Sequence, residues 1–70
     1  MTIAEKIRML ARRRGLAMQD IAAASGQSRQ NLSNKMSRDD FKTKELVKIA
    51  SAMGCDLVIT FRDRATGEEI

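Results

Sequence analysis

Within residues 18–36 the chain reads MQDIAAASGQSRQNLSNKM, two helix-length segments separated by little more than a glycine. In the first segment Ile21 and Ala22 face inward, and the neighbouring alanines favour helix. Gly26 ends that helix, and Ser28 is a preferred N-cap for the next one. Helices joined by so tight a turn cross at a steep angle, so the first is expected to hold the second where it projects from the domain.

The second segment, residues 28–36, is almost entirely polar. Leu32 and Met36 are four residues apart and share the face that contacts the domain, whereas Gln30 and Asn34 lie on the opposite face. A helix fits the DNA major groove, where Gln, Asn and Arg form paired hydrogen bonds with base edges. The alternative is a solvated surface helix, but such helices usually mix both signs of charge and this segment has no acid.

Regular apolar spacing predicts two further helices. Residues 2–14 begin at a Thr that can act as N-cap and end before Gly15, and residues 43–54 end at Gly54. The residues expected to face inward are Ile3, Ile7, Leu10 and Ala11 in the first helix, and Leu46, Ile49, Ala50 and Met53 in the second.

After Cys55 the pattern alternates with a period of two, which predicts a strand over residues 57–62 with Leu57, Ile59 and Phe61 on one side. A Thr-Gly turn signal further on allows a short hairpin. Because a lone strand has an open edge, we expect it to pair with a second copy across a two-fold axis. A hairpin folded back on its own domain is the alternative. The expected dimer interface comprises Leu57, Val58, Ile59, Thr60 and Phe61.

Charge is unevenly distributed along the 70 residues, whose net charge is +4. Residues 1–38 carry eight Lys and Arg against two acids, whereas residues 39–70 carry five against seven. Such polarity can orient a small protein on a phosphate backbone, although many basic domains bind no nucleic acid. We expect one domain, with residues 1–54 binding DNA and residues 55–70 forming its dimerisation element.

Several classes of function lack the residues they need. The chain has no His, one Cys and no acidic pair at a useful spacing, so we expect neither an enzyme nor a cofactor or metal site. No apolar run approaches the roughly 20 residues of a membrane span, and charges interrupt the N-terminal residues. A single Cys55 cannot form an internal disulfide, which favours a cytoplasmic protein. No small-molecule pocket is evident.

Residues 3–54 resemble the lambda-repressor-like helix-turn-helix regulators of the Cro/cI type, the XRE family. The resemblance rests on IRMLARRRGLAMQDIAAASGQSRQNLSNKM followed by LVKIASAMG. It implies a mainly α fold, a lambda-repressor-like bundle of four helices with a helix-turn-helix, to which the alternating pattern adds a C-terminal β-strand or short hairpin. The function implied is that of a sequence-specific double-stranded DNA-binding transcriptional regulator, a repressor of phage-like or antitoxin type. Its partners would be a roughly palindromic operator and a second copy of the chain.

The resemblance also implies individual roles for residues of the polar helix and its neighbours. The base-reading residues would be Arg29, Gln30, Ser33 and Asn34. The phosphate-contacting residues would be Met18, through its backbone amide, and Ser28, Asn31, Lys35, Arg38 and Lys42.

The start of the helix-turn-helix segment departs from the family pattern. Ala17 and Met18 stand where a Thr-Gln pair is usual, so a side-chain cap and a phosphate-facing amide are missing. Ser25 and Gln27 occupy positions that are usually apolar, and we expect them to loosen the packing of the turn.

Two further departures follow in the polar helix and the loop after it. Ala11 and Met36 replace a frequent Arg–Glu pair, which predicts an apolar contact instead. Asp39 and Asp40 lie close to the expected DNA backbone, where they would cap the helix over residues 43–54 or limit nonspecific binding. These departures leave a second hypothesis open, a protein–protein interaction module on a helix-turn-helix scaffold without specific DNA binding.

Overall fold

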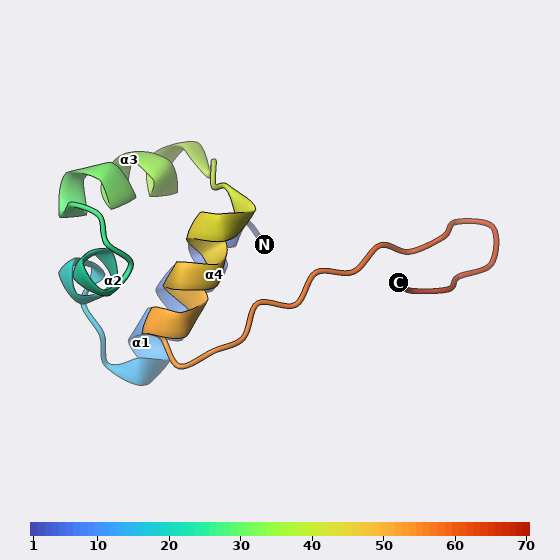
Figure 1. Ribbon diagram of the computed structural model, residues 1–70, viewed down its shortest axis with the longest axis horizontal. Helices are drawn as coiled ribbons and strands as arrows, with labels where there is room; N and C mark the ends of the chain where they lie inside the picture. Colours follow the sequence, from blue (N-terminus) through green and yellow to red (C-terminus); the bar gives the residue numbers. More distant parts are fainter.

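The computed structural model describes residues 1–70 as four helices followed by an extended C-terminal arm, residues 55–70 (Figure 1). The helices are α1 (Ile3–Arg14), α2 (Met18–Ala24), α3 (Arg29–Arg38) and α4 (Thr43–Ala52). The predicted mainly helical class and the four predicted helices are therefore confirmed. None of these helices has both the length and the apolar content that a membrane crossing requires.

The helix ends follow local capping chemistry. At the start of α1, the Thr2 hydroxyl accepts a hydrogen bond from the Glu5 backbone N–H at 3.1 Å, and Gly15 ends the helix with a left-handed φ of 66°. At the start of α3, the Ser28 hydroxyl accepts from the Asn31 backbone N–H, also at 3.1 Å. These caps explain why both boundaries of α1 and the start of α3 could be predicted from short-range spacing alone. The end of α3 was predicted two residues too early, at Met36, because the residue that ends it is Asp39 in a left-handed conformation and not a glycine.

One apolar core joins all four helices. Ile21 of α2, Leu32 of α3 and Ile49 of α4 are its fully buried large side chains, and α2 packs against both α3 and α4. Ala11 and Met36 are buried in the same cluster, as expected for apolar replacements of an ion pair. The remaining buried members are Ala4, Ile7, Ala22 and Met53.

The predicted inward face of α1 is wrong at its first residue. Ile3 is 40% exposed, whereas Ala4 is buried, so the buried stripe runs through Ala4, Ile7 and Ala11. The reason is that α1 turns this narrow, alanine-containing face towards the core. Ile3 then lies on the side of the helix that the core does not cover.

The predicted strand over residues 57–62 does not form. The chain is extended there, but the only β-type pairing in the arm is an isolated antiparallel bridge between Arg62 and Glu69 near its tip. Ile59 and Phe61, which were expected to pack against the helices, are 54% and 77% exposed. An extended segment becomes a strand only when a neighbouring segment supplies hydrogen-bond partners, and residues 56–60 have none within one chain. The tip of the arm, residues 61–70, does close as a short hairpin.

Candidate nucleic-acid interface

The outer face of α3 displays the four predicted base-reading residues, all of them exposed. Arg29, Gln30 and Ser33 line one shallow depression of about 400 Å³. Asn34 lies one turn after Gln30, and the Gln30 Nε2 donates to the Asn34 Oδ1 at 3.2 Å. This contact leaves the Gln30 Oε1 and the Asn34 Nδ2 free for an external partner, in a mutual orientation that is already set.

A second depression, of about 280 Å³, lies between α3 and the start of α4. Every residue that lines it is polar or charged, and four of the six predicted phosphate-contacting residues are among them. The lining residues are Asn31, Asn34, Lys35, Arg38, Asp40, Lys42 and Glu45. The structure therefore gathers most of the predicted phosphate-contacting residues on one side of α3.

The other two predicted phosphate-contacting residues lie outside this depression. The Ser28 hydroxyl is engaged as the N-cap of α3. The Met18 side chain packs against the core, and its backbone N–H, in the first turn of α2, makes no hydrogen bond within the chain. In place of the missing Thr-Gln pair, the Asp20 carboxylate accepts a hydrogen bond from the Ala17 backbone N–H at 2.9 Å.

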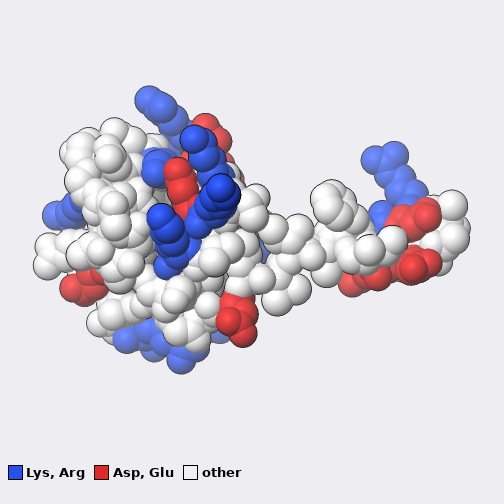
Figure 2. All heavy atoms as spheres, in the orientation of Figure 1, with Lys and Arg blue, Asp and Glu red and all other residues white.

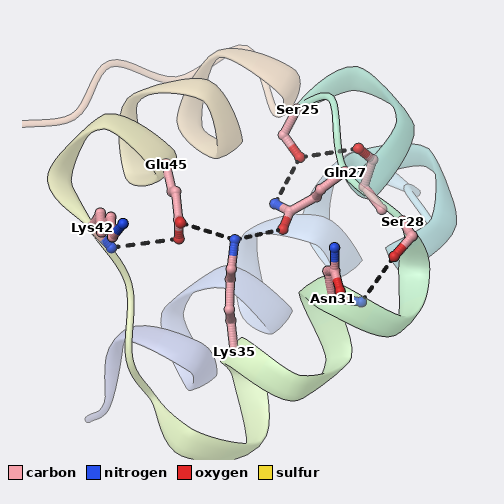
Figure 3. A network of polar contacts seen from close by, with 8 residues as sticks. Ser25, Gln27, Ser28, Asn31, Lys35, Lys42 and Glu45 are labelled. Carbon is pink, nitrogen blue, oxygen red and sulfur yellow. Dashed lines mark hydrogen bonds and ion pairs between the residues drawn. The ribbon is translucent and has the colours of Figure 1, made fainter.

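Lys35 is not a free cation. Its ammonium group lies 2.9 Å from the Glu45 Oε1 and donates to the Gln27 Oε1 at 3.0 Å (Figure 3). Lys35 comes from the middle of α3, Glu45 from the first turn of α4 and Gln27 from the turn between α2 and α3. A single ammonium group thus holds three elements together, and its capacity to contact a phosphate is largely used within the chain.

The network continues from Gln27 into the end of α2. The Gln27 Nε2 donates to the Ser25 Oγ at 3.1 Å, and the buried Ser25 hydroxyl donates to the Ile21 carbonyl at 2.7 Å. Ser25 and Gln27 therefore make defined hydrogen bonds in the turn whose packing they were predicted to loosen. A chain of hydrogen bonds takes the place of apolar packing, and no buried side-chain polar atom is left without a partner.

Glu45 also anchors the start of α4. Its carboxylate accepts a bond from the Lys42 backbone N–H at 3.4 Å in addition to its contact with Lys35. The hydrogen bond from Lys35 is the main cause that lowers the pKa of Glu45, partial desolvation opposes it, and the Lys42 N–H lowers the pKa further. The carboxylate is thus held in its charged form.

Asp39 caps a different helix from the one predicted. Its Oδ1 accepts a hydrogen bond from the Ala4 backbone N–H at 2.7 Å, so it caps the start of α1, and Glu45 caps α4. Asp39 has a φ of 52°, the left-handed conformation that ends α3 and that Asp tolerates better than most residues. The end of α3 is thereby fixed to the start of α1.

The polar depression carries both signs of charge. Arg38 and Lys42 are exposed and lie in no ion pair, Lys35 is neutralised by Glu45, and Asp40 adds a negative charge. Its net positive charge is therefore small. A polyanion in this position would be held mainly by hydrogen bonds and by two cations, and attracted only weakly at long range.

Reasoning from the sequence alone did not identify Ser25, Gln27, Asp39 and Glu45 as residues that hold α3 in place. Only Glu45 has a local signal, because it lies three residues after Lys42, the N-cap of α4, at capping-box spacing. Ser25, Gln27 and Asp39 have no such signal, because they hold α3 through a network of contacts that reaches residues of other helices.

The chain matches no protein-family model, no curated protein and no solved structure at a significant level.

Proposed function

We propose that this protein is a sequence-specific double-stranded DNA-binding transcriptional regulator, a repressor, that inserts α3 into the major groove. One observation carries the proposal: the buried Leu32 and Met36 anchor α3, while Arg29, Gln30, Ser33 and Asn34 all face outward. A helix of this kind is narrow enough for the major groove. Arg pairs bidentately with guanine, and Gln and Asn pair with adenine.

The α2–turn–α3 arrangement supports this proposal in the form of a helix-turn-helix of the lambda-repressor type. α2 packs against both α3 and α4, and Gly26 makes the turn with a φ of 75°. The network through Ser25, Gln27, Lys35 and Glu45 holds α3 against the rest of the domain. A reading helix needs such support, because base contacts demand a fixed side-chain geometry.

The phosphate contacts are assigned differently from the sequence-based expectation. We assign Arg38 and Lys42 as the principal cations, with Asn31 as a neutral contact, because these side chains are exposed beside α3. Lys35 becomes a positioning residue that holds α3 through Glu45 and Gln27. Phosphate contacts fix register on the duplex, whereas base contacts specify sequence.

Selection of bound sites from a random duplex pool, followed by affinity measurements over a salt series, tests the proposal. We expect one sequence to be enriched and log K to fall linearly with log salt, by about 0.9 for each phosphate neutralised. Gln30→Ala should relax the preference at one base position at a cost of about 1–3 kcal/mol. Arg64→Ala is the matched control, because Arg64 lies in the turn of the hairpin over residues 61–70, and this end of the arm points away from the helices (Figure 1).

Absence of binding to every duplex would favour a different function for α3. If no duplex binds even at low salt, α3 does not read DNA, and the same polar face would serve a protein partner. The mixed charge of the depression beside α3, with Asp40 and Glu45 among its lining residues, is the observation that favours this second function.

A further inference from the structure

The stem of the arm, residues 56–60, is an extended segment without partners. None of its backbone N–H or C=O groups forms a hydrogen bond within the chain, and Val58 is 78% exposed. The stem leaves the end of α4 and carries the tip away from the helices, which makes the molecule 42 Å long but only 23 by 20 Å across (Figure 1). An exposed apolar strand edge of this kind favours pairing with another chain.

The tip of the arm presents a second apolar surface. Phe61 and Ile70 are directly opposite in the hairpin and exchange two backbone hydrogen bonds of 3.0 and 2.9 Å. Residues paired in this way project to the same face, so the two side chains lie together. Both are largely exposed, at 77% and 80%.

The helical part of the molecule offers a matching groove. A depression of about 520 Å³ runs between α1, α4 and the base of the arm, and eleven of its fourteen lining residues are hydrophobic. On the helix side it is lined chiefly by Ile3, Ile7, Leu10, Leu46, Ile49 and Met53. We call this the α1–α4 groove. The partly exposed Ile3, which does not join the core, lies at this groove.

We propose that two copies of the chain associate by reciprocal arm exchange. The two stems pair antiparallel, and the tip of each arm places Phe61 and Ile70 in the α1–α4 groove of the other copy. An arm cannot fill its own groove in this way, because its stem forms one wall of the groove and carries the tip about 17 Å further on. Each copy supplies one arm and one groove, so the exchange closes at a dimer.

Charge complementarity favours a second copy as the occupant. Residues 1–54 carry eleven Lys and Arg against five acids, whereas the arm carries two against four. The arm of one copy is therefore attracted to the helical part of the other. Within the stem only Asp56, at its base, is charged, and Figure 2 shows an uncharged segment between the helical part and the charged tip. Residues 57–60, which must pair with their counterparts, thus lack the charges that blunt ordinary sheet edges.

Sedimentation equilibrium of the full chain over a wide concentration range is the first test. We expect a dimer, and we expect Val58→Asp to weaken it about tenfold or more, because Asp disfavours a strand and a charge on the stem opposes pairing of its edge. Val47→Asp is the matched control: Val47 is 52% exposed on α4 and does not line the groove, so the dimer should persist. A monomeric wild type, or a Val58→Asp variant that dimerises as tightly as the wild type, would overturn the proposal.

A mixing experiment separates arm exchange from pairing of the stems alone. Phe61→Asp damages the arm and Ile3→Asp damages the groove, so each variant should associate weakly by itself. A mixed dimer keeps one undamaged arm in one undamaged groove, and an equimolar mixture should regain association at least tenfold over either variant. Circular dichroism at low concentration checks that both variants remain folded. If the folded variants do not complement each other, the arm does not occupy the groove.

Discussion

At the scale of single residues, Lys35 is the residue whose role differs most between the sequence-based prediction and the structure. As a cation on a polar helix it matches a phosphate contact, yet its ammonium group is held by Glu45 and Gln27. Arg38, on the next turn of α3, is exposed and lies in no ion pair. These two cations in the second half of α3 therefore differ: Lys35 is held within the protein, whereas Arg38 is exposed and is proposed to contact a phosphate.

This difference predicts distinct effects of two alanine substitutions. Lys35→Ala should lower the urea midpoint of unfolding, because Glu45 loses its partner and Gln27 loses a donor. Arg38→Ala should leave that midpoint unchanged and reduce the salt dependence of DNA binding by about one phosphate. Equal effects of both substitutions on unfolding would contradict the assignment.

Because Glu45 titrates, the stability contributed by its ion pair with Lys35 depends on pH. Its pKa is lowered in the folded protein, chiefly by the hydrogen bond from Lys35, so its contribution to stability is present above the ordinary pKa of 4.5 and is lost as pH falls through the lower, folded value. Glu45→Gln should therefore be less stable than wild type near neutral pH, with the difference shrinking below 4.5. Thermal unfolding followed by circular dichroism measures the difference at each pH.

Glu68→Gln is the control for this titration, because Glu68 is an exposed glutamate of the arm that lies in no ion pair. Its difference from wild type should stay small at every pH. A wild-type advantage over Glu45→Gln that is constant with pH would show that the carboxylate charge of Glu45 does not contribute.

At the scale of elements, α3 is held at both of its ends and in the middle. Ser28 caps its start, Lys35 connects it to α4, and Asp39 connects its end to α1. α2 and the turn after it add the Ser25–Gln27 connection. The short helix that is proposed to read DNA is therefore fixed by polar contacts along its length as well as by its buried apolar anchors, Leu32 and Met36.

Asp39 provides the test at this scale. Asp39→Ala removes the acceptor for the Ala4 N–H and places Ala in a left-handed conformation, so we expect a loss of about 1–3 kcal/mol in unfolding free energy. Asp39→Asn keeps a side-chain oxygen and tolerates that conformation, so it should lose about 1 kcal/mol or less. Urea denaturation of the two variants measures both values. If they are equally stable, the link between α1 and α3 is not significant.

At the scale of the whole molecule, the helical part and the arm differ in net charge and in exposed apolar surface. The helical part carries the positive excess and the proposed reading helix, and the arm carries a negative excess and exposed apolar residues. The arm would be repelled by a DNA backbone and attracted to another copy. Two associated copies could then present two α3 helices to one operator.

The combination of the two proposals predicts how self-association affects DNA binding. A dimer would read two half-sites one DNA turn apart, about 34 Å. Val58→Asp should therefore lower the affinity for a duplex with both half-sites at least tenfold, without changing the affinity for a single half-site. Val47→Asp should change neither affinity. Equal loss on both duplexes would mean that Val58 affects α3 itself and not the association of two copies.

Local chemistry in the sequence was sufficient for the four helices. Both boundaries of α1 and the start of α3 follow from Thr2, Gly15 and Ser28, whose effects reach only three or four residues along the chain. The burial of Leu32 and Met36 follows from the helical period. These features depend on neighbours in sequence, so a reading of the sequence finds them.

The tertiary structure decided which polar groups meet and what the arm does. The bond from Ala4 to Asp39 joins residues 35 positions apart, and the pairing of Lys35 with Glu45 spans two helices. Helical period tells which side of a helix faces the core, but not which side chain of another helix lies opposite. In the same way, alternation in residues 57–62 favours an extended chain, yet a strand needs hydrogen-bond partners on a neighbouring segment. A single copy of this chain supplies such partners only to Phe61 and Arg62, in the hairpin at the tip, and none to residues 57–60.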